Sequence, residues 1–99
     1  MSFIAPYRQE IAQICEAHRV AELFLFGSHA TGSAQRKSDV DLLVRFKPFG
    51  PKGYFDNYLK LKDKLEALFN KKVDLLEAQT LRNPVLIRSI NRSKLKVYG

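Results

Sequence analysis

The sequence is short of cysteine, of long hydrophobic runs and of acidic residues. Its single cysteine, Cys15, permits no internal disulfide and no cysteine-based metal cluster, which fits a reducing compartment. The longest uninterrupted apolar stretch runs from Leu23 to Phe26, whereas a membrane-spanning helix needs about 18 or more apolar residues. The N-terminus shows no basic segment followed by an apolar run, so we expect no export signal. These absences argue against an integral membrane protein and predict a cytoplasmic location.

Basic residues outnumber acidic ones by 17 to 10, which gives the 99 residues a formal net charge of +7. This balance favours anionic partners, such as nucleotides, nucleic acid or an acidic protein surface, without choosing among them. On composition alone, a nucleic-acid binder is favoured over an enzyme. The length and a hydrophobic content of 45% predict a single domain over residues 1–99, because a second domain would lack a core of its own.

Hydrophobic periodicity predicts helices and strands in alternation. Apolar residues at intervals of three and four predict helices over residues 4–19 and 54–69. A further helix is predicted over residues 84–91 from its start signals. Short apolar or alternating runs predict strands over residues 20–26, 39–46, 73–76 and 95–98. This order predicts an α/β fold in which helices pack on a small mixed sheet.

Several residues are candidates for helix ends. Ser2 is placed to cap the first helix, and Ser28 to cap a short helix that runs toward residue 35. Asn70 tolerates the left-handed conformation that ends many helices. Asn83 followed by Pro84 combines a capping side chain with a proline at the first helical position. These signals predict where the helices begin and end.

Asp39 and Asp41 lie two residues apart in a predicted strand, so their carboxylates leave the same face about 7 Å apart. Because like charges repel and burial disfavours ions, we expect a cation beside them. Mg²⁺ is the natural candidate, since it binds hard oxygen ligands, often one or two carboxylates together with substrate phosphates. An Asp-x-Asp pattern by itself is more often an exposed strand edge.

Two further features favour a functional site. Gly27 and Ser28 follow a buried strand and open a short helix, so that backbone N–H groups face outward where an anion can bind. Asp74 stands in the otherwise apolar strand 73–76, where a lone buried carboxylate would be costly unless it is paired. A neighbouring strand could bring it beside the other two acids. Three carboxylates beside a phosphate-binding turn predict a centre with two metal ions for phosphoryl or nucleotidyl transfer.

These residues stand in a recognisable order. The chain contains Leu25-Phe26-Gly27-Ser28-His29-Ala30-Thr31-Gly32 and then Ser38-Asp39-Val40-Asp41-Leu42-Leu43-Val44, with ten residues between Ser28 and Asp39. This pattern resembles the signature of the DNA polymerase β-like nucleotidyltransferase superfamily. The short length, the strand that holds Asp74 and the tail from Leu81 resemble the minimal nucleotidyltransferases, so the resemblance covers nearly the whole chain.

The resemblance implies a role for each residue of the motif. Asp39 and Asp41 are expected to hold the two Mg²⁺ ions that bind the triphosphate, and Asp74 to complete the metal site nearest the nucleophile and help activate it. Gly27 and Ser28 are expected to hold the β- and γ-phosphates of an incoming nucleoside triphosphate. All three acids of the family have counterparts here, which implies an active enzyme.

The resemblance also implies a partner. Minimal domains of this type resemble the antitoxin of a type VII toxin-antitoxin module, whose toxin is a HEPN-domain ribonuclease. The implied reaction transfers AMP from ATP to a tyrosine of that toxin. Two alternatives stay open: transfer to RNA or to a small molecule, which the +7 charge supports, and a non-enzymatic module that covers its toxin. The chain lacks the further domain of larger relatives, so the base and the acceptor are open.

Other residues are expected to be structural. Cys15 lies among apolar helix positions and is predicted to be in the core, and His29 is predicted to be a loop residue without a role. Phe49, Tyr54 and Phe55 are expected to pack in the core rather than to form a partner surface. A C-terminal basic cluster is expected to be solvated, with contact to a partner or RNA as the alternative; it comprises Arg82, Arg88, Arg92, Lys94 and Lys96.

Overall fold

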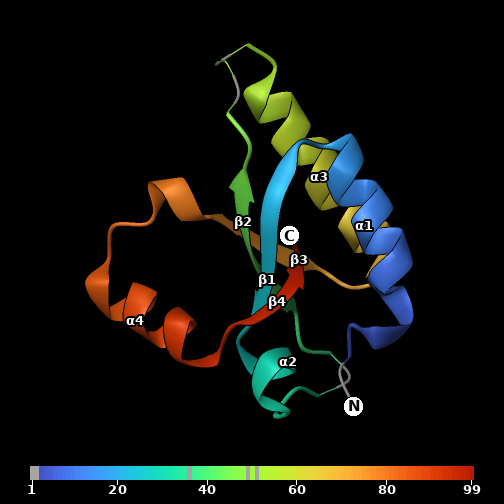
Figure 1. Ribbon diagram of the computed structural model, residues 1–99. Coiled ribbons are helices and arrows are strands. Elements are labelled where there is room, and N and C mark those ends of the chain that lie inside the picture. Colours follow the sequence, from blue (N-terminus) through green and yellow to red (C-terminus); the bar gives the residue numbers. More distant parts are fainter. Residues whose placement is uncertain (1–2, 36, 49, 51) are drawn as a thin grey trace.

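The computed structural model describes residues 3–35, 37–48, 50 and 52–99 (Figure 1). In chain order, its elements are η1 (Ala5–Tyr7), α1 (Arg8–Ala17), β1 (Val20–Phe26), α2 (Ser28–Thr31), β2 (Val40–Phe46), α3 (Tyr54–Phe69), β3 (Val73–Glu77), η2 (Ala78–Thr80), α4 (Pro84–Ser93) and β4 (Leu95–Tyr98). The candidate cap Ser2 lies outside the described residues. No helix in the described part of the chain is long and apolar enough to cross a membrane.

The predicted elements are all present, and their bounds differ mainly at helix ends. The first predicted helix is divided into the 3-10 turn η1 and α1, and it stops at Ala17 because Arg19 has a left-handed φ of 60°. Asn70 ends α3 in the predicted left-handed conformation, with a φ of 52°. The Asn83 side chain accepts hydrogen bonds from the N–H groups of Val85 and Leu86 at 3.0 and 3.3 Å, which confirms its capping role.

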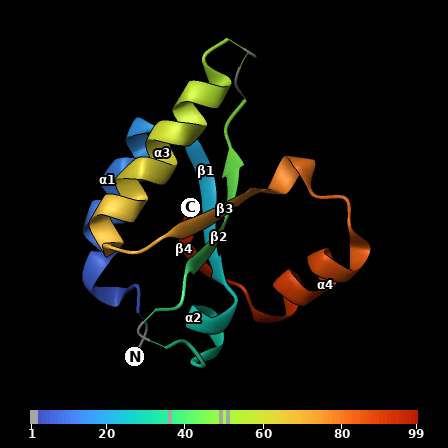
Figure 2. The same cartoon turned by 180° about the vertical axis from the view of Figure 1, so that it is seen from behind.

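The four strands form one mixed sheet in the order β3-β2-β1-β4. Strand β1 runs antiparallel to both β2 and β4, whereas β2 and β3 are parallel and are joined through α3. Figures 1 and 2 show α1 and α3 side by side on one face of this sheet and α4 beyond the opposite face. The predicted α/β fold, with helices packed on a small mixed sheet, is confirmed.

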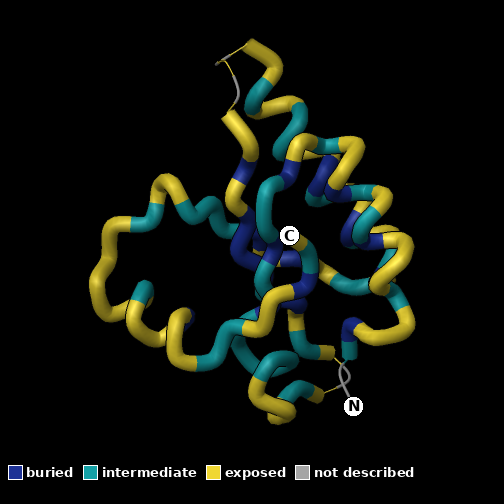
Figure 3. The backbone as a smooth tube through the Cα atoms, viewed as in Figure 1, coloured by how far each residue is buried: buried dark blue, intermediate teal, exposed yellow. Residues whose placement is uncertain are grey.

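The hydrophobic core lies between the sheet and the α1–α3 layer. Because strand side chains alternate, Val40, Leu42 and Val44 of β2 all point into this core. They are joined there by buried residues of both helices, namely Ile11, Cys15, Leu61, Leu65 and Phe69. Figure 3 shows the buried segments gathered at the centre of the sheet and along the inner sides of the two helices. The prediction that Cys15 is a core residue is confirmed.

The three aromatic residues that were expected to pack in the core, Phe49, Tyr54 and Phe55, have different outcomes. The Tyr54 ring packs edge-on against Phe46 at a centroid distance of 5.4 Å, and its hydroxyl donates to the Glu77 carboxylate. Burial, together with this carboxylate, raises the pKa of Tyr54. Phe55 is 69% exposed, so the prediction that it packs in the core is wrong. Phe55 lies to one side of the α3 stripe that faces the sheet. The third predicted residue, Phe49, lies outside the described residues.

Candidate active site

The sheet register brings two of the predicted acids together. Asp41 of β2 pairs with Asp74 of β3 in the parallel ladder, and on its other side it pairs with Phe26, the last residue of β1. Asp39 stands one residue before β2 rather than inside it, and its side chain is exposed. The predicted proximity of Asp74 to the Asp-x-Asp pair thus follows from two neighbouring strands that begin at the same end of the sheet.

The acids lie on the sheet face that α1 and α3 leave uncovered. Asp41 and Leu43 alternate with the buried residues of β2, so both point away from the α1–α3 core. Asp74 is exposed between the buried residues Val73 and Leu75 of β3, and it therefore points to the same side. A ligand on this face can reach the carboxylates without displacing the hydrophobic core.

The turn after β1 is built around Gly27. Its φ of 72° and ψ of −152° lie in a region that is essentially restricted to glycine. A Cβ atom at this position would overlap the Oδ2 atom of Asp41. The turn and the carboxylate therefore approach each other as closely as they do because residue 27 has no side chain.

Helix α2 begins differently from the prediction. Gly27, not Ser28, is the N-cap residue, and no side chain makes a capping hydrogen bond, so the prediction that Ser28 caps the helix is wrong. Ala30 and Thr31 donate the first hydrogen bonds of α2, both to the Gly27 carbonyl at 3.1 Å. The N–H groups of Ser28 and His29 precede this ladder and can donate to a ligand.

The short helix also ends earlier than predicted. It stops at Thr31 rather than near residue 35, because Gly32 adopts the left-handed conformation with a φ of 83°. The Ser33 N–H then donates to the Ser28 carbonyl at 3.0 Å, which closes the turn. The result is a helix of four residues, shorter than predicted.

The electrostatics of Asp41 reflect its crowded position. Burial raises the pKa of the Asp41 carboxyl, and the negative charges of Asp74 and then Asp39 raise it further. His29 acts in the opposite direction and lowers the pKa of Asp41. The three carboxylates are thus close enough to repel one another, and a cation between them would relieve this repulsion.

The donor set fits Mg²⁺ in its chemistry, since all three side chains offer hard carboxylate oxygens. In the described part of the chain, no three His, Cys, Asp or Glu side chains are grouped so that they could hold a metal ion together. Mg²⁺ sites usually combine one or two carboxylates with substrate phosphates and water, so they do not require a preformed group of three. Asp41 with either neighbouring acid can therefore supply the protein ligands.

His29 is more constrained than the sequence indicated. Its Nε2 atom lies 3.3 Å from the Ser38 carbonyl oxygen, and its ring is 4.4 Å from that of Phe3. These contacts link α2 to the segment just before β2 and place a titratable ring within electrostatic range of Asp41. The position of His29 directly after Ser28 in the motif could have drawn attention to it. Its link between α2 and the segment before β2 depends on tertiary contacts, which the sequence does not show.

A hollow of about 340 Å³ opens beside Asp39, between the segment before β2 and the turn from α3 to β3. Its lining residues are Lys37, Ser38, Asp39, Asn70, Lys71 and Lys72. The Val40 N–H donates to the Lys72 carbonyl at 2.9 Å, which ties the two segments together. Lysine side chains beside the acids make this edge of the site favourable for phosphate groups.

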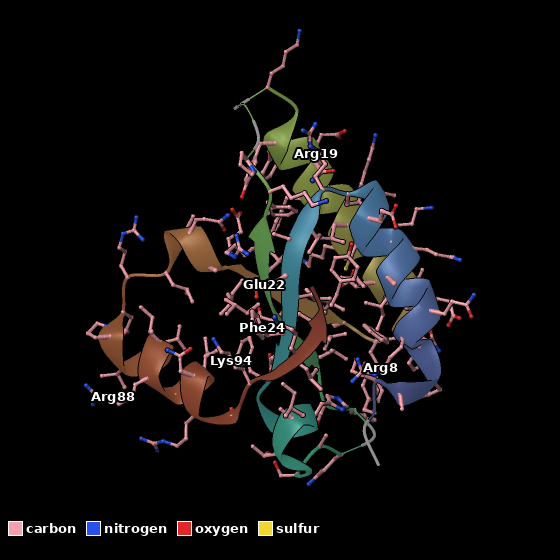
Figure 4. All side chains as sticks on the ribbon, viewed as in Figure 1. Arg8, Arg19, Glu22, Phe24, Arg88 and Lys94 are labelled. Carbon is pink, nitrogen blue, oxygen red and sulfur yellow. The ribbon has the colours of Figure 1, made fainter. Side chains whose placement is uncertain are left out.

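Lys94 and Lys96 of the predicted basic cluster contact β1 on this face of the sheet and are not simply solvated. Glu22 of β1 accepts from Arg45 Nε at 2.8 Å and lies 3.0 Å from Lys96 Nζ. These two cations lower the pKa of the half-buried Glu22 carboxyl. The Lys94 ammonium lies 4.5 Å from the centre of the Phe24 ring, and Figure 4 shows both side chains between α4 and the sheet.

Comparisons with known proteins identify a family and relatives of this chain. The family described as Nucleotidyltransferase domain matches residues 8–97. The protein adenylyltransferase MntA of Thermococcus cleftensis is 33% identical over 85 residues, with 78% of this chain and 83% of that protein covered.

Two solved structures share the fold. A candidate minimal nucleotidyltransferase superposes with a TM-score of 0.77 at 29% identity, covering 96% of this chain and 95% of that chain. A complex of a tri-AMPylated HEPN toxin from Shewanella oneidensis with an MNT antitoxin gives a TM-score of 0.64 at 18% identity. That match covers 93% of this chain and 69% of the other, and at such identity it shows the fold alone.

Proposed function

This chain belongs to the nucleotidyltransferase domain family, and we propose that it transfers AMP from ATP to a hydroxyl group of a protein acceptor. The observation that carries the proposal is the register that sets Asp41 beside Asp74 and against the Gly27 turn. Carboxylates next to a turn with available N–H groups suit a reaction in which a triphosphate is bound and cleaved.

In the proposed reaction, the acceptor hydroxyl oxygen forms a bond to the α-phosphorus of ATP. The bond from that phosphorus to the oxygen that bridges to the β-phosphate breaks, and pyrophosphate leaves with the electron pair. The hydroxyl proton passes to a carboxylate oxygen of Asp74 and from there to water. ATP and the acceptor are the only reactants that this balance requires.

We assign the residues of the turn and of β2 to the nucleotide. The turn formed by Gly27 and Ser28 would hold the β- and γ-phosphates, because the N–H groups at the start of α2 precede its hydrogen-bond ladder and residue 27 has no side chain to obstruct them. Asp39 and Asp41 would hold Mg²⁺ against the triphosphate, with Asp74 on the side of the acceptor. Bound Mg²⁺ would polarise the phosphoryl oxygens and offset the charge that develops on the leaving group.

We propose a HEPN-domain toxin as the acceptor, modified on a tyrosine hydroxyl, so that this protein acts as an antitoxin. Support comes from the relative of Thermococcus cleftensis, which is named a protein adenylyltransferase. Further support comes from the shared fold with the MNT antitoxin that is bound to a tri-AMPylated HEPN toxin.

The experiment that tests this proposal measures transfer of label from α-labelled ATP, with Mg²⁺, to a purified HEPN-domain protein encoded in the same genome. We expect label on the acceptor with the wild-type protein and a loss of about 100-fold or more with Asp41→Asn, as is typical when a group that stabilises transition-state charge is removed. Asp63→Asn is the matched control, because it makes the same chemical change at an exposed position of α3. ATP labelled only at the γ-phosphate should leave the acceptor unlabelled.

The labelling assay tests the first alternative, transfer to RNA, and a protection assay in cells tests the second, a module that covers its toxin without catalysis. Label in added RNA, with none in the protein acceptor, would favour nucleotidyl transfer to nucleic acid, which the basic composition supports. If Asp41→Asn protects cells from the toxin as well as the wild type does, a non-enzymatic module that covers its toxin is the better explanation. Equal labelling by wild type and Asp41→Asn would contradict the proposed role of Asp41.

A further inference from the structure

Helix α4 presents two different faces. Toward the sheet, Ile87 and Ile90 are among the residues around a cavity of about 170 Å³, and Leu43 lines its opposite side. On the other side, Val85 is 71% exposed, whereas Leu86, which is 37% exposed, precedes Ile90 by one helical turn and lies at the edge of the sheet-facing side. Burial of an exposed apolar side chain in an interface is favourable, because it removes apolar surface from water. The packing of α4 on its own sheet therefore leaves Val85 uncovered.

The charge of the C-terminal segment is of one sign. Residues 78–99 contain five arginine or lysine residues and no aspartate or glutamate. Lys96 pairs with Glu22 and Lys94 lies over Phe24, so both are engaged within the molecule. Arg88 and Arg92 are exposed and form no ion pair with a residue that the structure describes.

The two exposed arginines share a helix stripe with the apolar residue. Positions 85, 88 and 92 are spaced by three and four residues, so they line one side of α4, opposite Ile87 and Ile90. Figure 4 shows Arg88 on the outer side of α4, pointing away from the sheet. We name Val85, Arg88 and Arg92 the α4 surface.

The α4 surface stands beside the proposed active site. Leu43, which α4 covers, lies two residues from Asp41 on the same face of β2. Strand β4, which directly follows α4, pairs Leu95 with Leu25, and the next residue of β1, Phe26, pairs with Asp41. The C-terminal end of α4 is therefore next to the end of the sheet that carries the carboxylates. The remaining face of the molecule is occupied by α1 and α3.

We propose that the α4 surface docks the acceptor protein through an acidic patch that has an apolar centre, and so positions the acceptor hydroxyl over the acids. The inference rests on the proposed function, because the partner is the protein that receives AMP. Arginines around an exposed apolar residue are typical of protein interfaces, where the apolar group is buried and the cations select an acidic partner. An RNA partner would instead favour exposed aromatic rings for base stacking, and α4 contains no aromatic residue.

The test is titration calorimetry of the HEPN-domain protein from the same genome against this chain, residues 1–99. We expect Arg88→Glu/Arg92→Glu to raise the dissociation constant about tenfold or more, with a weaker salt dependence, because two attractive charges become repulsive. Val85→Ser should weaken binding without any change in charge. Lys60→Glu/Lys64→Glu is the matched control, since it reverses two exposed charges with the same spacing on α3, and it should leave binding unchanged.

Failure of this inference can be distinguished from failure of the proposed function. Asp41→Asn should bind the HEPN-domain protein like the wild type, because it alters the chemistry and not the α4 surface. Weakened binding by the α4 variants without any AMP transfer would support the docking surface and contradict the proposed reaction. AMP transfer with unchanged binding and unchanged KM for the acceptor in the α4 variants would overturn the docking surface, as would absence of binding by the wild type.

Two further outcomes also decide the proposal: binding of nucleic acid by the α4 surface, and a double variant that does not fold. If Arg88→Glu/Arg92→Glu weakens binding to a single-stranded polyadenylate probe but not to the HEPN-domain protein, the surface binds nucleic acid and the proposal is overturned. Thermal unfolding of each variant shows whether it is folded. If the double variant does not fold, Val85→Ser decides the question, because unchanged affinity in that variant would contradict an apolar contact at the centre of the interface.

Discussion

Replacing Gly27 with alanine is expected to destabilise the protein and to displace the carboxylate of Asp41. The φ and ψ angles of Gly27, 72° and −152°, lie in a region that costs a residue with a side chain about 1–3 kcal/mol. The added methyl group would also overlap the Oδ2 atom of Asp41, so the turn or the carboxylate must move. Overpacking of this kind typically costs another ~1–3 kcal/mol.

Gly32→Ala provides the matched control for this substitution. Gly32 also has a positive φ, 83°, but a Cβ atom there would meet no heavy atom within 4 Å. Its replacement should therefore cost only the left-handed backbone conformation, about 1–2 kcal/mol. The difference between the two variants reports the close approach of the turn to Asp41 together with the more restricted backbone conformation of Gly27.

The assay combines urea unfolding with transfer of AMP to the acceptor. For a domain of this length, each 1 kcal/mol lowers Tm by about 4–8 °C, so the two variants should be clearly separated in thermal unfolding as well. Gly27→Ala should also lose AMP transfer, because it moves Asp41, whereas folded Gly32→Ala should retain most of it. Equal stability of the two variants, with full activity in Gly27→Ala, would refute the argument.

Three further predictions concern individual side chains. Burial raises the pKa of the Cys15 thiol to about 12, so alkylation at pH 8 should be slow in the native protein and fast in urea. Asn83→Ala removes the acceptor for two N–H groups of α4 and should lower the unfolding free energy by about 0.5–2 kcal/mol in urea titrations, whereas Asn83→Asp should not. Because burial and neighbouring acids raise the pKa of Asp41, its ionisation costs stability as the pH rises through that raised pKa. Asp41→Asn should therefore raise Tm at pH 7 in EDTA, and the gain should vanish below the ordinary aspartate pKa; a lower Tm at pH 7 would contradict this.

Local patterns predicted most of the fold. Strands β1 and β4 and helix α3 have the predicted bounds, because each is marked by its own periodicity and by flanking glycine, proline or asparagine. The start of α2 was predicted wrongly, since Gly27 takes the N-cap position that Ser28 was expected to hold. That choice depends on the close approach of Asp41, a residue distant in sequence, which no local pattern contains.

The sequence predicted the proximity of Asp74 to the Asp-x-Asp pair, but not the register that sets it there. An acid in an apolar strand marked Asp74, and the Asp-x-Asp pair marked Asp39 and Asp41. Only the parallel pairing of β2 with β3 sets Asp41 directly beside Asp74, and this pairing is a property of the whole sheet. The arginines of the α4 stripe were noted in the sequence, with contact to a partner as an alternative to solvation, but the helix pattern does not say what the exposed Val85 meets.

The most direct test of the central claim is neutralisation of the HEPN-domain ribonuclease by a substoichiometric amount of this protein. With Mg²⁺ and ATP, one molecule should inactivate many acceptor molecules, and mass spectrometry should find AMP on an acceptor tyrosine. Without ATP, or with Asp41→Asn, the same small amount should leave the ribonuclease active. Neutralisation that requires equimolar protein and proceeds equally without ATP would contradict a catalytic role and would indicate simple occlusion.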